Sequence, residues 1–237
     1  MINPLKSIVA RIKRRRFNRA NSEIIGIKAK KLTYLSTDSL LEMKATVAAI
    51  EREKIAGMFI EAGCALGGSA ILIGMTKNRD RRFGVYDVFG MIPEPSEKDG
   101  VDVHERYKVI REGKSTGIGG DEYYGYQEDL LEKVRNNFLD FGLDPEAHNI
   151  EFVKGLFQDT LKIQGNVAFA HIDCDWYESV TVCLEQIVPR LSVGGKLIID
   201  DYNDWSGCKS AIDDYFKEMT GNYKFTHRSK LQIERIK

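Results

Sequence analysis

A glycine-rich stretch near residue 60 holds the first residues that can do chemistry. Gly63, Gly67 and Gly68 follow a short apolar run and precede an amphipathic one, which predicts a strand, a tight turn and a helix. Their spacing differs from the dinucleotide fingerprint, and Glu61 at the strand end would repel a pyrophosphate but can accept hydrogen bonds from an ammonium group. A ligand with an amino-acid head and no phosphate, such as S-adenosylmethionine, fits this stretch.

A second acid, Asp87, ends the next predicted strand. A carboxylate at that place can accept hydrogen bonds from both ribose hydroxyls of a nucleoside. Because NAD sites share this feature, Asp87 supports the cofactor prediction without identifying the cofactor by itself. The alternative is that Glu61 and Asp87 each only cap the end of a strand.

Three further carboxylates, those of Asp173, Asp200 and Asp201, follow the fourth and fifth predicted strands. These strands are neighbours in a doubly wound sheet, so the three side chains are expected to meet at its carboxyl edge. A hard divalent cation relieves their mutual repulsion, and an all-oxygen ligand set favours magnesium over zinc. A metal-bound hydroxyl loses its proton more easily, and methyl transfer to oxygen needs that step. Asp173 is expected to be a metal ligand and also the catalytic proton acceptor.

Other interpretations of these residues stay open. Asp175 is expected to cap a helix that begins near Trp176, and His171 to be a core histidine rather than a base. Asp173-x-Asp175 also resembles the metal motif of nucleotide-sugar glycosyltransferases, although Glu61 disfavours their diphosphate ligands. A further alternative is a protein that keeps the fold of such an enzyme and binds a ligand but catalyses no reaction.

The elements that must position these groups follow an α/β pattern. From Gly57 onward short apolar runs alternate with helix-length amphipathic segments, which predicts a doubly wound parallel sheet. The last two strands are too close in sequence for a crossover and must form an antiparallel hairpin. Five parallel strands followed by such a hairpin are typical of the class I methyltransferase (Rossmann-like) fold. The predicted strands are Met58–Ala62, Phe83–Tyr86, Ile150–Val153, Val167–Ile172, Lys196–Ile199, Tyr223–Thr226 and Leu231–Arg235.

Residues 1–36 are predicted to be a basic N-terminal extension, and residues 37–237 the methyltransferase domain. Residues 1–31 contain ten basic side chains and one acid. The segment is interpreted as a solvated extension, an arm of a homo-oligomer, or a weak contact with an anionic membrane surface. Its apolar face consists of Ile8, Val9 and Ile12.

A helix is expected to lead from this extension into the domain. Apolar side chains recur at helical spacing from Ser39 to Ile55, and Thr37 and Asp38 are its candidate N-caps.

The overall composition excludes several function classes. With 35 Lys and Arg against 35 Asp and Glu, the chain has no net positive field to hold a nucleic acid. The sequence shows neither a membrane-length apolar run nor a secretory signal, so a cytoplasmic location is expected. The cysteines lack C-x-x-C spacing, which favours reduced, buried thiols over a zinc site or disulfides. They are Cys64, Cys174, Cys183 and Cys208.

An insertion at about residues 90–125 interrupts the alternation of strands and helices. It is rich in glycine, proline and charge, and a loop of this length in a compact domain is usually a lid or binding loop. Residues 91–125, here called the lid segment, are expected to be mobile rather than rigid, with contacts from Tyr123 and Tyr124. The next helix is expected to start near Tyr126. A solvated insertion is the alternative.

Several stretches taken together resemble the macrocin-type (TylF-like) O-methyltransferases, which methylate sugar hydroxyls of natural products with S-adenosylmethionine and magnesium. The resemblance covers most of residues 32–216. It is carried by Glu61-Ala62-Gly63, Gly67-Gly68-Ser69, Tyr86-Asp87, residues 154–161, residues 171–177, residues 199–202 and Trp205-Ser206-Gly207.

The resemblance implies a site as well as an activity. The acceptor is expected to be a small, sugar-containing metabolite of natural product or glycan biosynthesis. Two stretches depart from the family pattern: Ala65-Leu66 replaces a Trp-Arg pair, and Phe89-Gly90-Met91-Ile92-Pro93 replaces Phe-Glu-Gly-Leu-Pro. The implied residues are Glu61, Gly63, Ser69 and Asp87 for the cofactor, Phe157 and Gln158 beside its adenine, and Asp173, Asp200 and Asp201 for magnesium.

Overall fold

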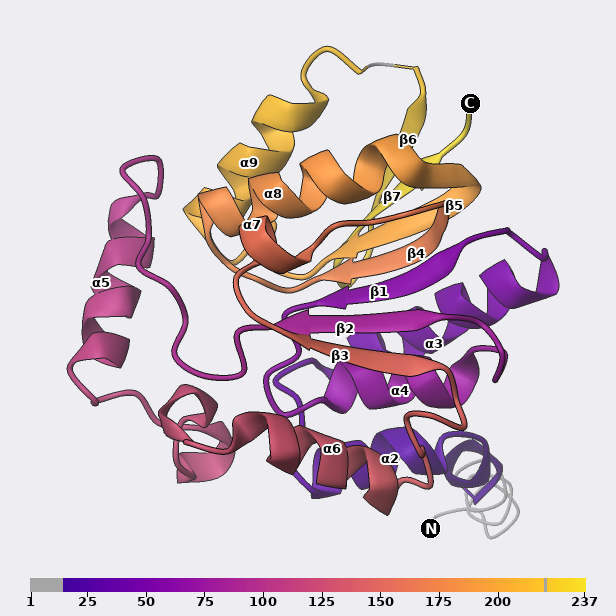
Figure 1. Cartoon of the computed structure of the whole chain (residues 1–237), viewed down its shortest axis with the longest axis horizontal. Helices are drawn as coiled ribbons and strands as arrows, with labels where there is room; N and C mark the ends of the chain where they lie inside the picture. Colours follow the sequence, from indigo (N-terminus) through magenta and orange to yellow (C-terminus); the bar gives the residue numbers. More distant parts are fainter. Residues whose placement is uncertain (1–14, 220) are drawn as a thin grey trace, which may run out of the picture.

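The structure is a computed structural model that describes residues 15–219 and 221–237. Its centre is a mixed sheet of seven strands in the order β3-β2-β1-β4-β5-β7-β6 (Figure 1). β1 to β5 pair in parallel, whereas β7 is antiparallel to both β5 and β6. The predicted parallel sheet with a C-terminal antiparallel hairpin is therefore confirmed.

Six of the seven predicted strands begin where the sequence places them. β5 begins at Leu191 rather than Lys196, because Gly194 and Gly195 lie in an irregular stretch of the strand and not in a turn before it. The strands are β1 Met58–Ala62, β2 Phe83–Asp87, β3 Ile150–Lys154, β4 Val167–Ile172, β5 Leu191–Ile199, β6 Tyr223–His227 and β7 Leu231–Arg235.

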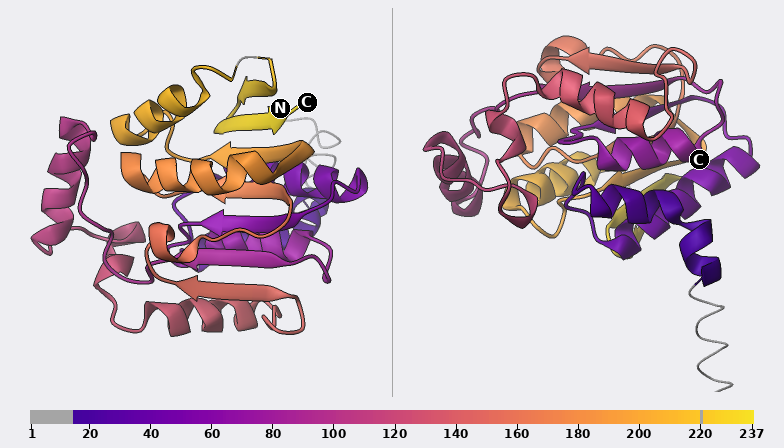
Figure 2. Two further views of the ribbon diagram at one scale, coloured as in Figure 1. Left: turned by 45° about the horizontal axis from the view of Figure 1, so that its top comes forward. Right: turned by 90° about the horizontal axis from the view of Figure 1, so that it is seen from below.

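Helices cover both faces of the sheet (Figures 1 and 2). One layer contains α2 (Ser22–Ala29), α3 (Thr37–Arg52), α4 (Gly68–Thr76) and α6 (Leu130–Asp140). The other contains α7 (Phe157–Thr160), α8 (Tyr177–Ile187) and α9 (Ser206–Phe216). α5 (Val101–Arg111) belongs to neither layer and lies beyond the end of the sheet to which the parallel strands point, where its first turn contacts the start of α9 (Figure 2). Short 3-10 turns occur at Ile118–Gly120, Tyr124–Tyr126 and Val188–Arg190.

Alternation along β1 shows how the two layers share the core. Ile60 and Ala62 pack with the α8 and α9 layer, and Phe59 packs with the α3 and α4 layer. Every residue of β1 is buried, as expected for a central parallel strand. Both faces of the sheet are thus closed, and its carboxyl edge is left to bind ligands.

The segment before the sheet packs against the domain. Ile24 and Ile27 of α2 are buried in the same layer as α3 and α4. α3 is capped by Ser36, whose hydroxyl accepts the N–H of Ser39 at 3.0 Å, so the prediction of Thr37 or Asp38 as N-cap is wrong. Ser36 fills that role because it has the extended backbone that an N-cap requires. The apolar face predicted around Ile8 lies outside the described residues.

The lid segment is more regular than the sequence predicts. It contains the helix α5 and a 3-10 turn, and it ends in a second 3-10 turn, whereas its mobility stays a prediction. The following helix starts at Leu130 and not near Tyr126, because Tyr126 lies in a 3-10 turn that its hydroxyl fixes. That hydroxyl donates to the carbonyl of Ile110 at 2.7 Å and accepts the N–H of Ser115 at 3.0 Å.

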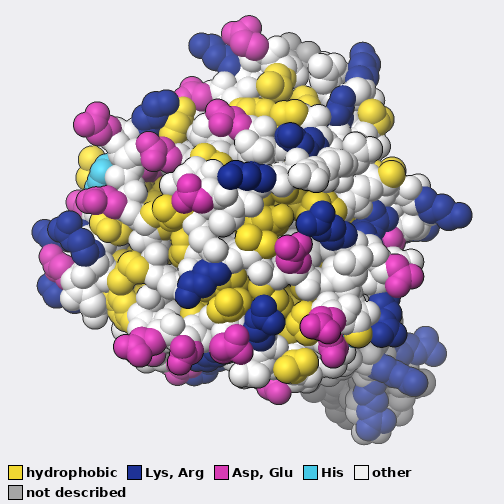
Figure 3. Space-filling model, viewed as in Figure 1, with side chains coloured by type: hydrophobic (Ala, Val, Ile, Leu, Met, Phe, Trp, Pro, Cys, Tyr) yellow, Lys and Arg dark blue, Asp and Glu magenta, His cyan; other side chains and the backbone are white. Residues whose placement is uncertain are grey.

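Three global features bear on the remaining expectations. Within residues 15–219 and 221–237, no helix combines the length and apolarity needed to span a membrane. Basic and acidic side chains are interspersed over the face seen in Figure 3. All four cysteines are buried free thiols, as predicted.

Candidate active site

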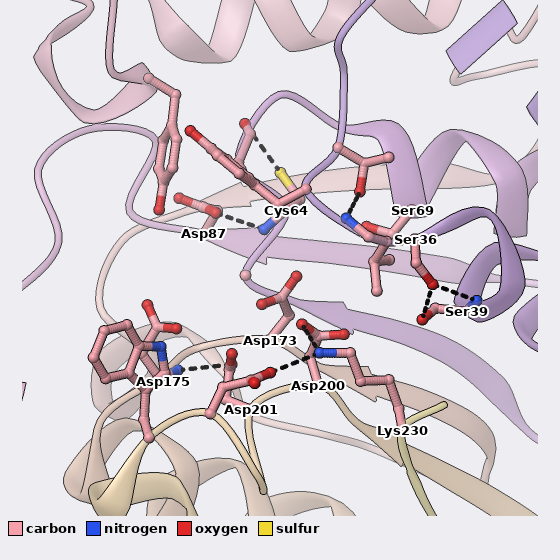
Figure 4. Close-up of a pocket in the computed structure, with 18 of the residues that line it drawn as sticks. Ser36, Ser39, Cys64, Ser69, Asp87, Asp173, Asp175, Asp200, Asp201 and Lys230 are labelled. Carbon is pink, nitrogen blue, oxygen red and sulfur yellow. Dashed lines mark hydrogen bonds and ion pairs between the residues drawn. The ribbon is translucent and has the colours of Figure 1, made fainter. Parts of the chain in front are cut away.

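A pocket of about 570 Å³ opens at the carboxyl edge of the parallel strands. Its wall combines the glycine-rich turn after β1, the acidic loops after β4 and β5, residues 32–36, and parts of the lid segment (Figure 4). Elements far apart in the sequence therefore meet around one cavity of the size that small-molecule sites usually have.

The glycine-rich turn is shaped by close contact with the loop after β4. Gly63 has a φ of +85°, and a Cβ there would lie 1.8 Å from the carbonyl oxygen of Asp173. The N–H of Asp173 also donates to the carbonyl of Ala62 at 2.9 Å. Glycine is required at position 63 because the acidic loop crosses the turn directly, which joins the predicted cofactor side to the predicted metal side.

Glu61 lies beneath this turn and is fully buried. Its carboxylate accepts a hydrogen bond from the hydroxyl of Ser69 and lies 3.1 Å from Nδ1 of His171. Ser69 lines the pocket, whereas Glu61 does not. Glu61 thus positions Ser69 and His171, and its direct contact with a ligand stays a prediction.

Asp87 lines the pocket from the end of β2. Its two carboxylate oxygens accept the backbone N–H groups of Cys64 and Phe89, each at 2.7 Å, and Figure 4 shows the first of these hydrogen bonds. Burial raises the pKa of this carboxyl group, and the backbone donors oppose that shift. Each oxygen keeps a further lone pair, so the carboxylate can still accept ribose hydroxyls.

Phe157 and Gln158 begin the short helix α7 and line a smaller adjoining cavity. That cavity shares Gly63 and Asp87 with the main pocket. The structure therefore brings all the residues predicted for the cofactor to one side of the site. Glu61 is the only one of them that lines neither cavity.

The predicted metal residues come together because β4 and β5 are hydrogen-bonded neighbours with Ile172 opposite Ile199. Asp173 and Asp175 follow β4, and Asp200 and Asp201 follow β5 (Figure 4). In the described part of the chain, two groups of carboxylates have ligand atoms within 4.8 Å of one another. They are Asp173, Asp175 and Asp201, and Asp200, Asp201 and Asp204.

Asp175 joins the cluster instead of capping α8, so the sequence-based expectation for it is wrong. The residue has a φ of +60°, a backbone conformation that side chains other than glycine rarely adopt. Its N–H donates to the carboxylate of Asp201 at 3.3 Å, and α8 receives no cap from its own N-cap residue, Trp176. The Asp-x-Asp spacing is the sequence signal that points to this role.

The cluster is electrostatically strained without a cation. Burial, followed by repulsion from neighbouring carboxylates, raises the pKa values of Asp173 and Asp201 well above the usual range and that of Asp175 to about 6. Asp200 differs: burial raises its pKa, but His171 and Lys230 outweigh burial and lower it. Carboxylate oxygens alone form the donor set, which fits a hard divalent cation such as magnesium.

His171 is a buried histidine with acids on both sides. Its Nδ1 faces Glu61, and its Nε2 lies 3.7 Å from Asp200. Burial lowers the pKa of His171, but these carboxylates raise it well above the usual value. The prediction of a core position is confirmed, and the residue links the floor of the glycine-rich turn to the acidic loop after β5.

Two cationic residues of the pocket wall were missed by sequence reasoning. Arg106 of α5 donates to the hydroxyl of Ser115 at 2.9 Å and lies over the ring of Tyr123. Lys230, from the turn between β6 and β7, pairs with Asp200. Neither belongs to a recognisable motif, because each reaches the site through the tertiary placement of its element.

Comparison with known proteins agrees with this geometry. The family model described as macrocin-O-methyltransferase (TylF) matches residues 19–224. A tetracenomycin-class enzyme of Streptomyces olivaceus, 8-demethyl-8-(2,3-dimethoxy-alpha-L-rhamnosyl)-tetracenomycin-C 4'-O-methyltransferase, is 34% identical over 77% of this chain and 67% of its own. Demethyldecarbamoylnovobiocin O-methyltransferase of Streptomyces niveus is 30% identical over the same shares.

The solved structure of the O-methyltransferase NovP superimposes with a TM-score of 0.73 at 27% identity, covering 87% of this chain and 83% of that one. This similarity confirms the predicted class I methyltransferase fold. Together with the family match and the curated relatives, it favours an O-methyltransferase over the two alternatives, a glycosyltransferase and a non-catalytic binding module. The chain belongs to the macrocin-O-methyltransferase (TylF) family and is an O-methyltransferase.

Proposed function

We propose that this enzyme transfers the methyl group of S-adenosylmethionine to a hydroxyl of a sugar-containing small molecule with the help of magnesium. The observation that carries the proposal is the meeting of a glycine-rich turn and an aspartate cluster in one pocket, at Gly63 and Asp173. The relatives named above, which methylate a rhamnosyl tetracenomycin and a novobiocin precursor, support a glycosylated acceptor.

The cofactor would lie on the side of β1 and β2. Its methionine part would lie along Gly63 and Ser69, and Asp87 would accept hydrogen bonds from the ribose hydroxyls. Its adenine would border Phe157 and Gln158 in the adjoining cavity. Glu61 contributes by holding Ser69, with a direct contact to the ammonium group still an expectation.

Magnesium would be held by Asp173, Asp200 and Asp201, as the sequence indicates, with Asp175 beside them. When bound, the cation would lower the pKa of an acceptor hydroxyl and so favour its deprotonation. The carboxylate of Asp173 receives no hydrogen bond from the protein within residues 15–219 and 221–237, so its oxygens are free for ligands. Asp173 and Asp175 are the candidates for taking the acceptor proton, since both line the pocket.

The acceptor would occupy the part of the pocket that the cofactor leaves free. Aromatic rings suit a sugar because they cover its apolar C–H faces while leaving hydroxyls to polar groups. The rings that line the pocket belong to Tyr34, Tyr123, Tyr124, Trp176 and Trp205.

A direct assay tests the proposal. S-adenosylhomocysteine binding should be detectable by isothermal titration, and methyl transfer from labelled cofactor should appear with deoxysugar glycosides or nucleotide sugars in the presence of magnesium. Transfer that persists in excess EDTA would reject the metal, and failure to bind S-adenosylhomocysteine would reject the cofactor.

Three further expectations remain predictions. They are the cytoplasmic location, a homo-oligomeric state, and a weak contact of the basic N-terminal residues with a membrane surface. The division at residue 36 between an extension and the domain is a prediction of the same kind.

A further inference from the structure

An arginine of the lid segment lines the pocket without an acidic partner. Arg106 belongs to α5, and within residues 15–219 and 221–237 no carboxylate forms an ion pair with its guanidinium group. The other cationic residue of the pocket wall, Lys230, is paired with Asp200 and Asp204. Arg106 therefore brings a positive charge to the pocket that no ion pair of the described chain neutralises.

Two buried residues hold the Arg106 side chain in place. Its Nη2 donates to the hydroxyl of Ser115 at 2.9 Å, and its Cζ lies 5.7 Å from the centre of the Tyr123 ring. Ser115 and Tyr123 are both buried. The backbone N–H of Ser115 is itself fixed, since it donates to the hydroxyl of Tyr126 at 3.0 Å. The guanidinium group is thus oriented before any ligand binds.

Most of the hydrogen-bonding capacity of this guanidinium group is unused. A guanidinium group presents several N–H donors in a planar fork. In the described part of the chain, the group makes a hydrogen bond only to Ser115. None of its unused donor atoms is among the buried polar atoms that lack a partner there. The remaining donors are accessible to a ligand.

The positive charge of Arg106 also acts on two other residues of the pocket wall. Burial raises the pKa of Tyr34, and Arg106 opposes that shift. Burial likewise raises the pKa of Asp175 to about 6, and Arg106 is among the groups that oppose this shift. Tyr34 lines the pocket before α3, and Asp175 lines it after β4. A ligand that extends from Asp175 towards Tyr34 would therefore meet the guanidinium group.

We propose that Arg106 binds an oxyanion of the acceptor, so that the enzyme prefers a sugar bearing a phosphate ester or a carboxylate over an uncharged glycoside. The inference rests on the proposed function and adds the charge of its acceptor. A guanidinium fork matches the oxygen geometry of both anions, and the hydrogen bonds that it makes to them are strengthened by charge. A divalent cation at the acidic loops would offset the repulsion between those loops and the anion.

The test compares three acceptor analogues by isothermal titration of the full chain with magnesium and saturating S-adenosylhomocysteine. They are rhamnose 1-phosphate, methyl galacturonide and uncharged methyl rhamnoside. Wild type should bind one charged analogue at least about tenfold more tightly than methyl rhamnoside, and that analogue identifies the anion. In Arg106→Gln the preference should disappear, while affinity for methyl rhamnoside stays within about threefold of wild type.

Two further variants separate the contact from its support. Ser115→Ala keeps the charge of Arg106 but removes the hydroxyl that orients it, so part of the preference should be lost. Arg111→Gln is the matched control, because Arg111 lies at the end of the same helix, is exposed and does not line the pocket. This control should keep the full preference. Thermal melting of each variant shows whether it is folded.

The outcomes distinguish this inference from the proposed function. Equal losses for charged and uncharged analogues in Arg106→Gln would show a structural role and overturn the proposal. A charge preference that persists in Arg106→Gln, or wild type that binds S-adenosylhomocysteine but prefers neither charged analogue, would overturn it while leaving the proposed function intact. Failure to bind S-adenosylhomocysteine would reject the proposed cofactor, and the analogues titrated without it would still decide the charge preference.

Discussion

The carboxylate of Asp99 accepts a hydrogen bond at 2.8 Å from the backbone N–H of Tyr177, the first residue of α8. Asp102 makes the equivalent contact with α9, accepting the N–H of Ser206 at 3.0 Å. Neither helix is capped by the side chain of its own N-cap residue. The lid segment therefore supplies the missing caps of the two helices that directly follow the two acidic loops.

Two glycines, Gly100 and Gly207, allow the lid segment to approach the start of α9 closely. A Cβ at position 207 would lie 1.9 Å from the Asp99 carboxylate, and a Cβ at Gly100 would lie 2.3 Å from the Ser206 hydroxyl. Gly207 belongs to one of the stretches that resemble the methyltransferase family, and its place here explains why a side chain is not accommodated. Docking of the lid segment and the shape of the acidic loops are thus physically linked.

Asp99→Ala should lower the free energy of unfolding by about 0.5–2 kcal/mol, the usual cost of losing a helix N-cap. It should also speed proteolytic cleavage inside the lid segment, because one of the contacts that hold the segment against α8 and α9 is lost. Chemical denaturation and limited proteolysis measure the two effects. Glu105→Ala, which removes an exposed acid from α5, is the control, and equal behaviour of the two variants would contradict the capping role.

Ligands should slow cleavage of the lid segment. Tyr123, Tyr124 and Arg106 line the pocket from this segment, so an occupied pocket adds contacts that hold it closed. Limited proteolysis of the wild-type chain with and without S-adenosylhomocysteine, magnesium and a glycoside tests this. Equal cleavage rates under both conditions would show that the segment does not act as a gate.

The sequence predicts the acidic site well because topology alone positions it. Parallel strands deliver the residues that follow them to one edge, so Asp173 and Asp200 had to be neighbours once β4 and β5 were recognised. The same reasoning places Gly63 and Asp87 on the adjacent strands. None of these predictions needed side-chain detail.

What the sequence could not supply depends on local geometry. The Asp-x-Asp spacing points to a metal role for Asp175, but the direction of its side chain depends on a positive φ, which the spacing does not reveal. The position of Lys230 beside Asp200 follows from the register of β7 on β5. The helix α5 was missed because only Val103 and Ile110 are buried on it, too few apolar positions for a helical pattern to be read.

Asp87→Ala should weaken binding of S-adenosylhomocysteine by about 1–3 kcal/mol, because two ribose hydroxyls lose a charged acceptor. The same change removes the acceptor for the N–H groups of Cys64 and Phe89, so melting must be measured beside isothermal titration. Asp87→Asn is the milder variant, since its amide keeps one acceptor oxygen. Unchanged affinity in both variants would reject the ribose assignment.

Asp173→Asn should abolish turnover and the magnesium-dependent rise in melting temperature, while affinity for S-adenosylhomocysteine stays within about threefold. The metal-free variant should melt no lower than wild type, because removing one charge relieves repulsion in the cluster. A variant that keeps turnover and magnesium stabilisation would reject the site.

Asp175→Asn separates proton transfer from metal binding. Loss of turnover with magnesium stabilisation retained would assign the proton acceptor to Asp175, because an amide cannot take a proton from the acceptor hydroxyl. Turnover comparable to wild type would assign that role to Asp173 alone. Thermal melting with and without magnesium, read beside the methyl-transfer rate, distinguishes the two results.

The stability of the metal-free protein should fall as the pH rises from about 4 to about 7. The pKa of Asp175 is raised from 3.8 to about 6, first by burial and then by Asp200, although hydrogen bonds oppose the shift. In that window the folded state binds more protons than the unfolded state, so each rise in pH favours unfolding. Asp173 and Asp201 shift in the same direction and add to the effect.

The contribution of Asp175 is at most about 3 kcal/mol, since each unit of pKa difference corresponds to about 1.4 kcal/mol. Urea denaturation of the EDTA-treated chain at a series of pH values measures the slope. Saturating magnesium should flatten or reverse it, because the cation binds the ionised carboxylates of the folded state. A metal-free slope that survives in Asp175→Asn and in Asp173→Asn alike would show that other groups, and not this cluster, set the pH dependence.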